Sequence, residues 1–231
     1  MSRAAVLALT FAIAFIVLFL APPFLPYRFD PYPLINWADV VDLLTPLILI
    51  PLYWLLALQV GMPRSVPWVV TFLALAAAWV EGHGIHLAAN AIGHLLKNQP
   101  GPALDLTEFW DERFGHILWH SAALGLSALV LVAGIRADLP PVAGRSMAVV
   151  AGLVYGFALF LIGDEGGTAV LMIVFGVAFV FATLAAWRRA FASPILTMFT
   201  TGYGAVVLLF AAWFVYWGGR LPQFSELGWI K

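Results

Sequence analysis

Histidines recur at helical spacing in the apolar stretch 66–96. Relative to His83, the side chains of His86, Asn90 and His94 lie at i+3, i+7 and i+11. At about 100° per residue, these four side chains fall within a stripe about 80° wide on one face of a helix. Imidazole is a common protein ligand of zinc, iron and copper, so this face is a candidate metal-binding surface.

A second polar stripe opens the apolar stretch 113–135. Glu112, His116 and His120 are spaced i, i+4 and i+8 and again cover about 80° of a helix. The His-x-x-x-His pair places two rings within reach of one ion. A short Pro-Gly loop joins the two stretches, so we expect antiparallel neighbouring helices whose polar stripes face each other. Small residues on both would allow close backbone approach: Gly82, Gly84, Gly93 and Gly115.

The chain that carries these groups is strongly apolar. Of its 231 residues, 63% are hydrophobic and 10% are charged, and the mean hydropathy is +0.98. Soluble domains are about a quarter charged, so this composition predicts an integral membrane protein whose main partner is the lipid bilayer. Eleven basic residues against twelve acidic ones give no positive field for nucleic acid. The absence of cysteine excludes disulfides, thiolate metal sites and iron–sulfur clusters.

Seven apolar runs approach the length that crosses a bilayer, about 20 residues of helix. They predict an all-α polytopic membrane protein in which residues 1–231 form a single domain of seven transmembrane helices. Pro46 and Pro51 predict a kink in the second run. The runs are Ala4–Ala21, Asp39–Val60, Val66–Leu96, Arg113–Ile135, Met147–Ile162, Ala169–Trp187 and Pro194–Trp217.

Basic residues in short loops set the orientation of such a protein. With the N-terminus inside, the inner basic residues occupy tight loops whose one acid is Asp138, whereas the outer ones are diluted by many acids. We therefore predict an N-in/C-out orientation. The compact loops favour a bacterial inner membrane, with the polar stripes facing the periplasm. The inner group is Arg3, Arg64, Arg136, Arg145, Arg188 and Arg189, and the outer group is Arg28, Lys97, Arg113, Arg220 and Lys231.

The two stripes predict a metal site between the third and fourth runs. His86, His116 and His120 are the expected ligands, with His83 or His94 as an additional one. Two or three histidines with a carboxylate leave an open coordination position, and a bound ion brings the pKa of water towards neutrality. Glu112, Asp111 or Asp42 would handle the proton. Asn90 would donate a hydrogen bond to a developing oxyanion.

Four further acids are candidates for orienting the ligand rings, and each also has a structural explanation. Asp39 begins the second run, where the helix dipole favours an acid. Glu81 points more than about 120° away from the histidine stripe, which favours contact with another helix. Asp164 and Glu165 fit equally well as the solvated tight turn between the fifth and sixth runs.

The segment from Asp111 to His120, Asp-Glu-Arg-Phe-Gly-His-Ile-Leu-Trp-His, resembles the His-x-x-Trp-His helix of alkaline ceramidases and Per1-type GPI-remodelling proteins. These belong to a superfamily of seven-span membrane hydrolases that includes the progestin and adipoQ receptors. The resemblance implies a zinc ion held by His116 and His120 with His86 or His94. It also implies Asp111 or Asp42 as the acid, and cleavage of a lipid amide or ester. The family's pair lies on its last span, whereas three predicted spans follow His120 here.

The leading hypothesis is therefore a zinc-dependent hydrolase acting on a lipid-like substrate at the outer leaflet. A second hypothesis is a redox protein, with copper or iron on the same histidines or with haem held between His86 and His120. The third is a non-catalytic metal-binding subunit with membrane-complex partners, or a carrier. A carrier usually needs polar groups on both sides of the midplane, and the inner halves of these runs are almost purely apolar.

Overall fold

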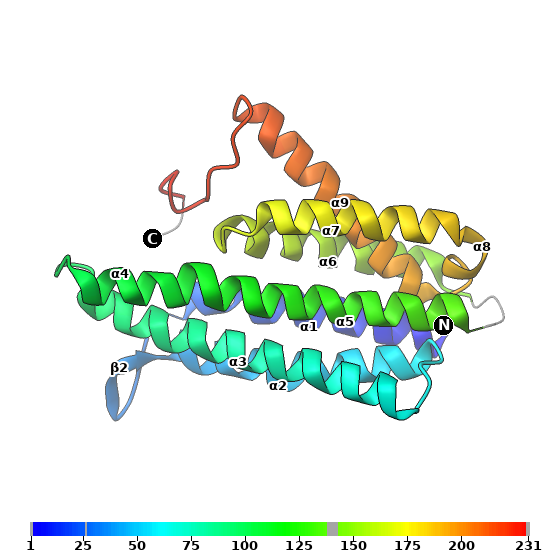
Figure 1. Ribbon diagram of the computed structural model, residues 1–231, viewed down its shortest axis with the longest axis horizontal. Helices are drawn as coiled ribbons and strands as arrows, with labels where there is room; N and C mark the ends of the chain where they lie inside the picture. Colours follow the sequence, from blue (N-terminus) through cyan, green and yellow to red (C-terminus); the bar gives the residue numbers. More distant parts are fainter. Residues whose placement is uncertain (1, 26, 138–142, 230–231) are drawn as a thin grey trace.

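The protein forms a bundle of long helices (Figure 1). The computed structural model describes residues 2–25, 27–137 and 143–229. The separate long helices are α1 (Arg3–Leu20), α2 (Trp37–Gln59), α3 (Val66–Leu96), α6 (Arg145–Glu165) and α9 (Pro194–Tyr216). A continuous helical stretch is built from α4 (Pro102–Glu108), the π-helical segment η2 (Phe109–Gly115) and α5 (His116–Arg136). The shorter elements are η1 (Pro22–Phe24), β1 (Arg28–Phe29), β2 (Tyr32–Asn36), α7 (Ala169–Ala185) and α8 (Trp187–Ala190).

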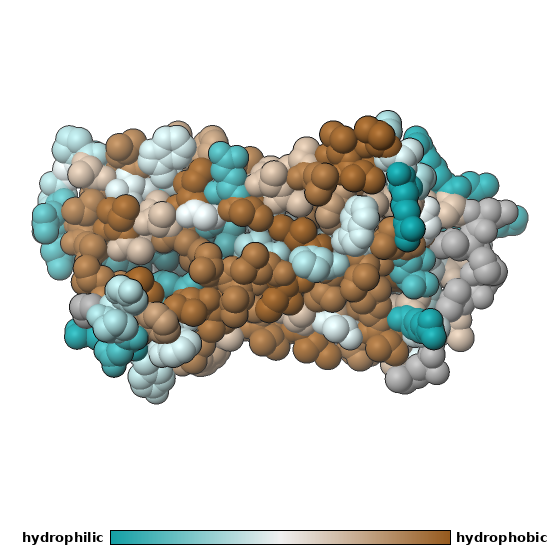
Figure 2. Space-filling view, turned by 90° about the horizontal axis from the view of Figure 1, so that it is seen from below, coloured by the Kyte–Doolittle hydropathy of each residue, from teal (hydrophilic) through white to brown (hydrophobic). Residues whose placement is uncertain are grey.

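Within the described residues, six helical stretches are long and apolar enough to cross a membrane, as expected for an all-α integral membrane protein. Figure 2 shows one face of the molecule, where hydrophobic residues fill most of the middle and hydrophilic residues gather towards both ends. The shorter apolar helix α7 has 17 residues. It is therefore about 25 Å long, at the short end of what a bilayer requires. Seven spans and the N-in/C-out orientation stay predictions.

Several boundaries differ from the predicted ones. The third run coincides with α3, but the fourth begins at Pro102 rather than Arg113, since Pro102 starts a helix that continues without a break into α5. Asp164 and Glu165 form the last turn of α6 instead of the predicted tight turn. Gly166 and Gly167 make that turn, and Gly167 has a φ of 62°, which favours glycine. Asp138 and Lys231, which entered the orientation argument, lie outside the described residues.

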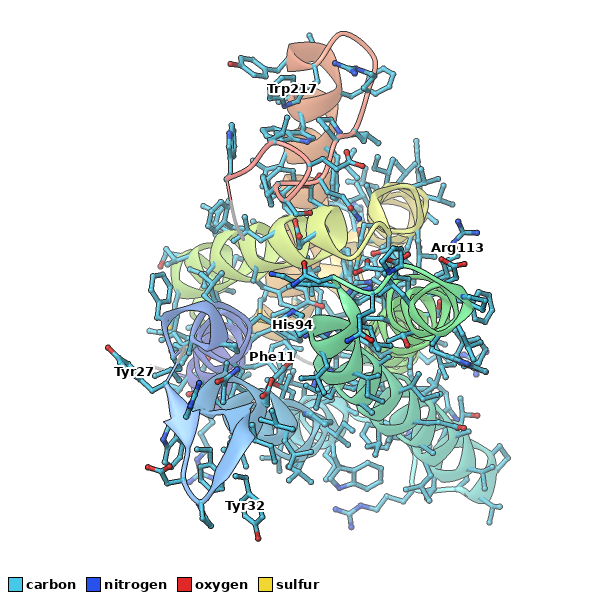
Figure 3. All side chains as sticks on the ribbon, turned by 90° about the vertical axis from the view of Figure 1, so that its left-hand side faces the viewer. Phe11, Tyr27, Tyr32, His94, Arg113 and Trp217 are labelled. Carbon is cyan, nitrogen blue, oxygen red and sulfur yellow. The ribbon has the colours of Figure 1, made fainter. Side chains whose placement is uncertain are left out.

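Two features were absent from the sequence prediction. A short antiparallel hairpin, β1 with β2, precedes α2. Tyr27 and Tyr32, labelled in Figure 3, are exposed there, a placement that suits aromatic side chains at the level of lipid headgroups. The helix α8 is a single turn that connects α7 to α9. Pro46 and Pro51, for which the sequence predicts a kink, both lie within α2, and the helix continues past them to Gln59.

A cluster of hydroxyl groups joins four helices in the core. Tyr53, Ser127, Tyr155 and Tyr203, from α2, α5, α6 and α9, are all fully buried. The Tyr53 hydroxyl lies 2.9 Å from that of Ser127 and 3.0 Å from that of Tyr155, which lies 3.2 Å from that of Tyr203. Hydrocarbon offers no hydrogen-bond partner, so these groups satisfy one another. Close packing supports the cluster: a Cβ atom at Gly152 of α6 would lie 2.5 Å from the carbonyl oxygen of Met198 of α9.

Candidate metal centre

Two glycines bring the predicted polar stripes together. A Cβ atom at Gly82 of α3 would lie 2.7 Å from the backbone nitrogen of Trp119, so only glycine fits there without movement. Across the contact, a Cβ atom at Gly115 would lie 3.1 Å from the backbone nitrogen of His86. The predicted close approach is confirmed at these two positions. Gly84 has open space around it, and Gly93 makes only an ordinary contact with Thr107.

The π-helical segment η2 determines which acid faces the histidines. At its end, the backbone N–H of His116 donates to the carbonyl oxygen of Asp111, an i→i+5 bond. Residues five apart in an α-helix point about 140° away from each other, but the wider π turn brings Asp111 to the same side as His116. Asp111 is accordingly buried, whereas the Glu112 side chain is 50% exposed. The α-helical period used for the prediction had placed Glu112 in the stripe.

His86, Asp111 and His116 form a compact group between α3 and η2–α5. Each offers a ligand atom, and these atoms all lie within 4.8 Å of one another. Nδ1 of His86 lies 2.5 Å from Oδ1 of Asp111, and the rings of His86 and His116 have centroids 4.4 Å apart. Asp111 and His116 are buried and His86 is partly so. This group could hold a metal ion.

His120 extends the group towards the turn between α6 and α7. Its ring is stacked on that of His116, with centroids 5.7 Å apart. Its Nδ1 lies 2.6 Å from the hydroxyl of Thr168, and both side chains are buried. Gly166 packs directly on the rings, because a Cβ atom there would lie 2.8 Å from Cε1 of His120 and 3.3 Å from Cδ2 of His116. The α6–α7 turn therefore closes one side of the cluster.

His83 lies on the opposite side, against α2. Its Nε2 is 3.0 Å from the carbonyl oxygen of Asp42 and 3.2 Å from the Oδ1 atom of the same residue. The Asp42 carboxylate also accepts a hydrogen bond from Thr45. The ring of His83 lies 6.1 Å from that of His86. Asp42, predicted as an alternative acid, thus contacts His83 rather than the His86–Asp111–His116 group.

The donor atoms fit a transition-metal ion. Within the described residues, Nδ1 of His83, Nδ1 of His116 and Nε2 of His120 are buried without a hydrogen-bond partner. Buried polar atoms normally have partners, and a bound ion is one explanation for unpaired imidazole nitrogens. Two imidazoles and one carboxylate form the three-ligand set of catalytic zinc sites and also that of non-haem iron sites.

Haem does not fit between these helices. A porphyrin held by His86 and His120 would have to lie between α3 and α5. The two backbones touch there through Gly82 and Gly115, and the rings of His86 and His116 are in contact. The His86–Asp111–His116 group could thus hold a small ion, but the space between α3 and α5 does not admit a flat macrocycle.

The remaining predicted site residues lie in other surroundings. Glu112 is close to the group, with its carboxylate 3.6 Å from Nδ1 of His116. Asn90 is half-buried one helical turn beyond His86 on α3. His94 and Glu81 are both exposed. Figure 3 views the bundle from the end that carries the histidines. Arg113, labelled there, points outward at the edge of the bundle.

Of the three outlying acids, Asp39 and Glu165 have hydrogen-bond partners away from the histidines, whereas both carboxylate oxygens of Asp164 are buried without one among the described residues. Asp39 accepts a hydrogen bond from the backbone N–H of Asn36 and forms the capping box of α2, as its position at a helix start indicated. Glu165 accepts hydrogen bonds from Gln223 and Ser225 of the C-terminal segment. Asp164 is buried in the last turn of α6, one turn after Phe160, whose ring contacts Phe224 of that segment.

Thr168 and Gly166 were missed as members of the site. Their only signal was a polar Gly-Gly-Thr sequence directly before an apolar run.

Comparison of the chain with protein-family models, with curated proteins and with solved structures finds no match.

Proposed function

We propose that this protein is an integral membrane metalloenzyme that hydrolyses an amide or ester bond of a lipid-like substrate. The observation that carries the proposal is the His86–Asp111–His116 group, whose ligand atoms lie within 4.8 Å of one another beside unpaired buried nitrogens of other histidines. Two imidazoles and one carboxylate leave coordination positions for substrate and water. A zinc ion bound there would supply Lewis acidity that polarises a carbonyl group and activates water near neutral pH.

The side chains around the group have distinct roles in this proposal. Asp111 orients the His86 ring through Nδ1 or binds the ion directly, and His120 is an additional ligand through Nε2. Glu112 is exposed at the mouth of the site, 3.6 Å from His116, and carries the proton between water and leaving group. Asn90 is the candidate donor to the oxyanion.

The depth of the site supports a lipid-like substrate. The histidines lie level with the turn between α6 and α7, because Gly166 and Thr168 touch them. Figure 1 shows α4 and the end of α3 extending beyond that turn. A turn between two apolar helices marks the boundary of the membrane, where the ester and amide bonds of lipids lie. An apolar groove of about 420 Å³ between β2–α2 and α3 opens nearby, with Gly84 and Leu87 in its wall.

Elemental analysis of the full chain purified in detergent tests the metal site. We expect about one equivalent of zinc in the wild type and none in a His116→Ala/His120→Ala double variant. A His94→Ala variant separates the clustered histidines from the exposed one and should keep the metal. Hydrolysis of fluorogenic lipid amides and esters then tests the activity, which Glu112→Gln should abolish without loss of metal. A metal-free wild-type protein would overturn the proposal.

A redox function is the second candidate, and an aromatic chain favours it. The ring of Trp119 lies 3.8 Å from that of His120, Trp79 stacks on Trp119 at 6.1 Å, and Tyr53 lies 5.8 Å from Trp79. Closely spaced tryptophan and tyrosine side chains are the protein groups that conduct single electrons. Iron or copper in the purified protein, with no hydrolysis of any lipid, would favour this function over the hydrolase.

A further inference from the structure

A groove of about 430 Å³ runs between α3 and α5 in the half of the bundle opposite the histidines. Trp68, Thr71 and Leu75 line it on α3, and Gly125 and Ala128 line it on α5. Leu75 closes its inner end, since a Cβ atom at Gly125 would lie 2.6 Å from a Leu75 methyl carbon. The hydroxyl of Thr71 donates to the carbonyl oxygen of Pro67 within α3, so the wall of the groove is apolar.

The length of the groove matches one leaflet of a bilayer. It extends along α5 from Gly125 to Arg136, a rise of about 16 Å at 1.5 Å per residue. Half of a hydrocarbon core is about 15 Å. Because Arg136 ends the apolar stretch Pro102–Arg136, a groove of this length reaches from the end of that span to about the middle of a bilayer.

The open end of the groove is positively charged. The guanidinium group of Arg136 lies over the ring of Trp68, 5.7 Å from its centroid, which holds the cation at the mouth of the groove. The N-terminus of α3 is at the same mouth, and its dipole adds partial positive charge. Arg189 donates to the carbonyl oxygen of Ile135, the residue next to Arg136. An anion is therefore favoured at this position.

We propose that this groove binds an anionic phospholipid. The phosphate lies at Arg136 and the start of α3, and one acyl chain follows the groove as far as Leu75 and Gly125. A zwitterionic lipid would bring its own ammonium group to the same cations and bind less tightly. The site lies at the other end of the bundle from the histidines and is independent of any metal bound there.

Native mass spectrometry of the delipidated full chain in detergent tests this site. The probes are phosphatidylglycerol and phosphatidylcholine with identical oleoyl chains. We expect phosphatidylglycerol to bind about tenfold more tightly, a difference typical of one hydrogen-bonded charge. Arg136→Gln should remove that preference, and Ala128→Phe, which fills the groove, should weaken both lipids.

Matched control variants distinguish the loss of lipid binding in the groove from general effects of removing an arginine or adding a phenylalanine. Arg220→Gln removes an exposed arginine that follows α9, and Leu153→Phe enlarges an exposed side chain in the first half of α6, outside the groove. Both should bind like the wild type, and circular dichroism should show all four variants folded. Equal binding of the two lipids, or an unchanged Ala128→Phe variant, would refute the site. Displacement of the lipid by an equal concentration of glycerol phosphate would assign the charge to a free anion and overturn the lipid proposal.

Discussion

The hydroxyl group of Thr168 lies 2.6 Å from Nδ1 of His120, so the turn between α6 and α7 is tied to α5 at the histidine cluster. This contact occupies one nitrogen of the ring, and Nε2 is the one left for an ion. The Thr168 side chain, at the turn before α7, thus determines which ring nitrogen of His120 is available to bind an ion.

Thr168→Val tests that relationship, because valine keeps the shape of threonine and removes the hydroxyl. We expect the affinity for zinc to fall by about tenfold, as is usual when the partner of a ligand ring is lost. Titration of the purified protein with zinc against a chelator measures it. Thr107→Val is the matched control, since the Thr107 hydroxyl donates to the carbonyl oxygen of Ala103 within its own helix, α4. An equal effect of both substitutions would contradict the assignment.

The π-helical segment predicts different roles for two adjacent acids. Asp111 faces His86 and Glu112 faces solvent, so Asp111→Asn should weaken zinc binding by about 10- to 100-fold. Glu112→Gln should leave zinc affinity within about twofold of wild type, since an exposed pair contributes little. The reverse order of the two affinities would mean that the helix keeps the α-helical period in this region.

Gly82→Ala should destabilise the bundle by about 1–3 kcal/mol, because the added Cβ atom meets the backbone of Trp119 at 2.7 Å. Gly84→Ala, two residues away on the same helix, enters open space and should be neutral or stabilising by up to about 1 kcal/mol. Unfolding in mixed detergent micelles compares the two. Equal stabilities would show that α3 and α5 are not in backbone contact.

Tyr155→Phe removes the hydroxyl that bonds to both Tyr53 and Tyr203 and leaves their buried hydroxyls short of a partner. We expect a loss of about 1–3 kcal/mol in the same unfolding assay. Tyr216→Phe, at an exposed position near the end of α9, should change stability by less than about 0.5 kcal/mol. The contrast depends on burial, so similar losses for both would argue against a hydroxyl cluster.

The sequence was most informative where a single physical requirement dominates. A helix in lipid must be apolar over its length, so the run Val66–Leu96 predicted α3 with the same bounds. The close approach at Gly82 and Gly115 was predictable for a related reason, since polar stripes on neighbouring helices need small residues to meet.

The sequence was least informative where the backbone departs from its regular period or where distant segments meet. Nothing in residues 109–115 marks a π-helix, so the fixed step of 100° assigned Glu112 in place of Asp111 to the stripe. His94 shares the stripe of His86 yet is exposed, because its surroundings depend on tertiary packing. Thr168 reaches His120 from a turn 48 residues away, and spacing within one helix cannot reveal such a partner.

The hydroxyl cluster of Tyr53, Ser127, Tyr155 and Tyr203 has a consequence for how the protein is made. Its members come from helices that leave the ribosome at very different times, and α9 is the last of them. Until α9 arrives, Tyr155 lacks the partner that Tyr203 provides. Consolidation of the bundle must therefore wait until α9 has been synthesised, and a chain truncated before α9 would expose a half-formed polar cluster to membrane quality control.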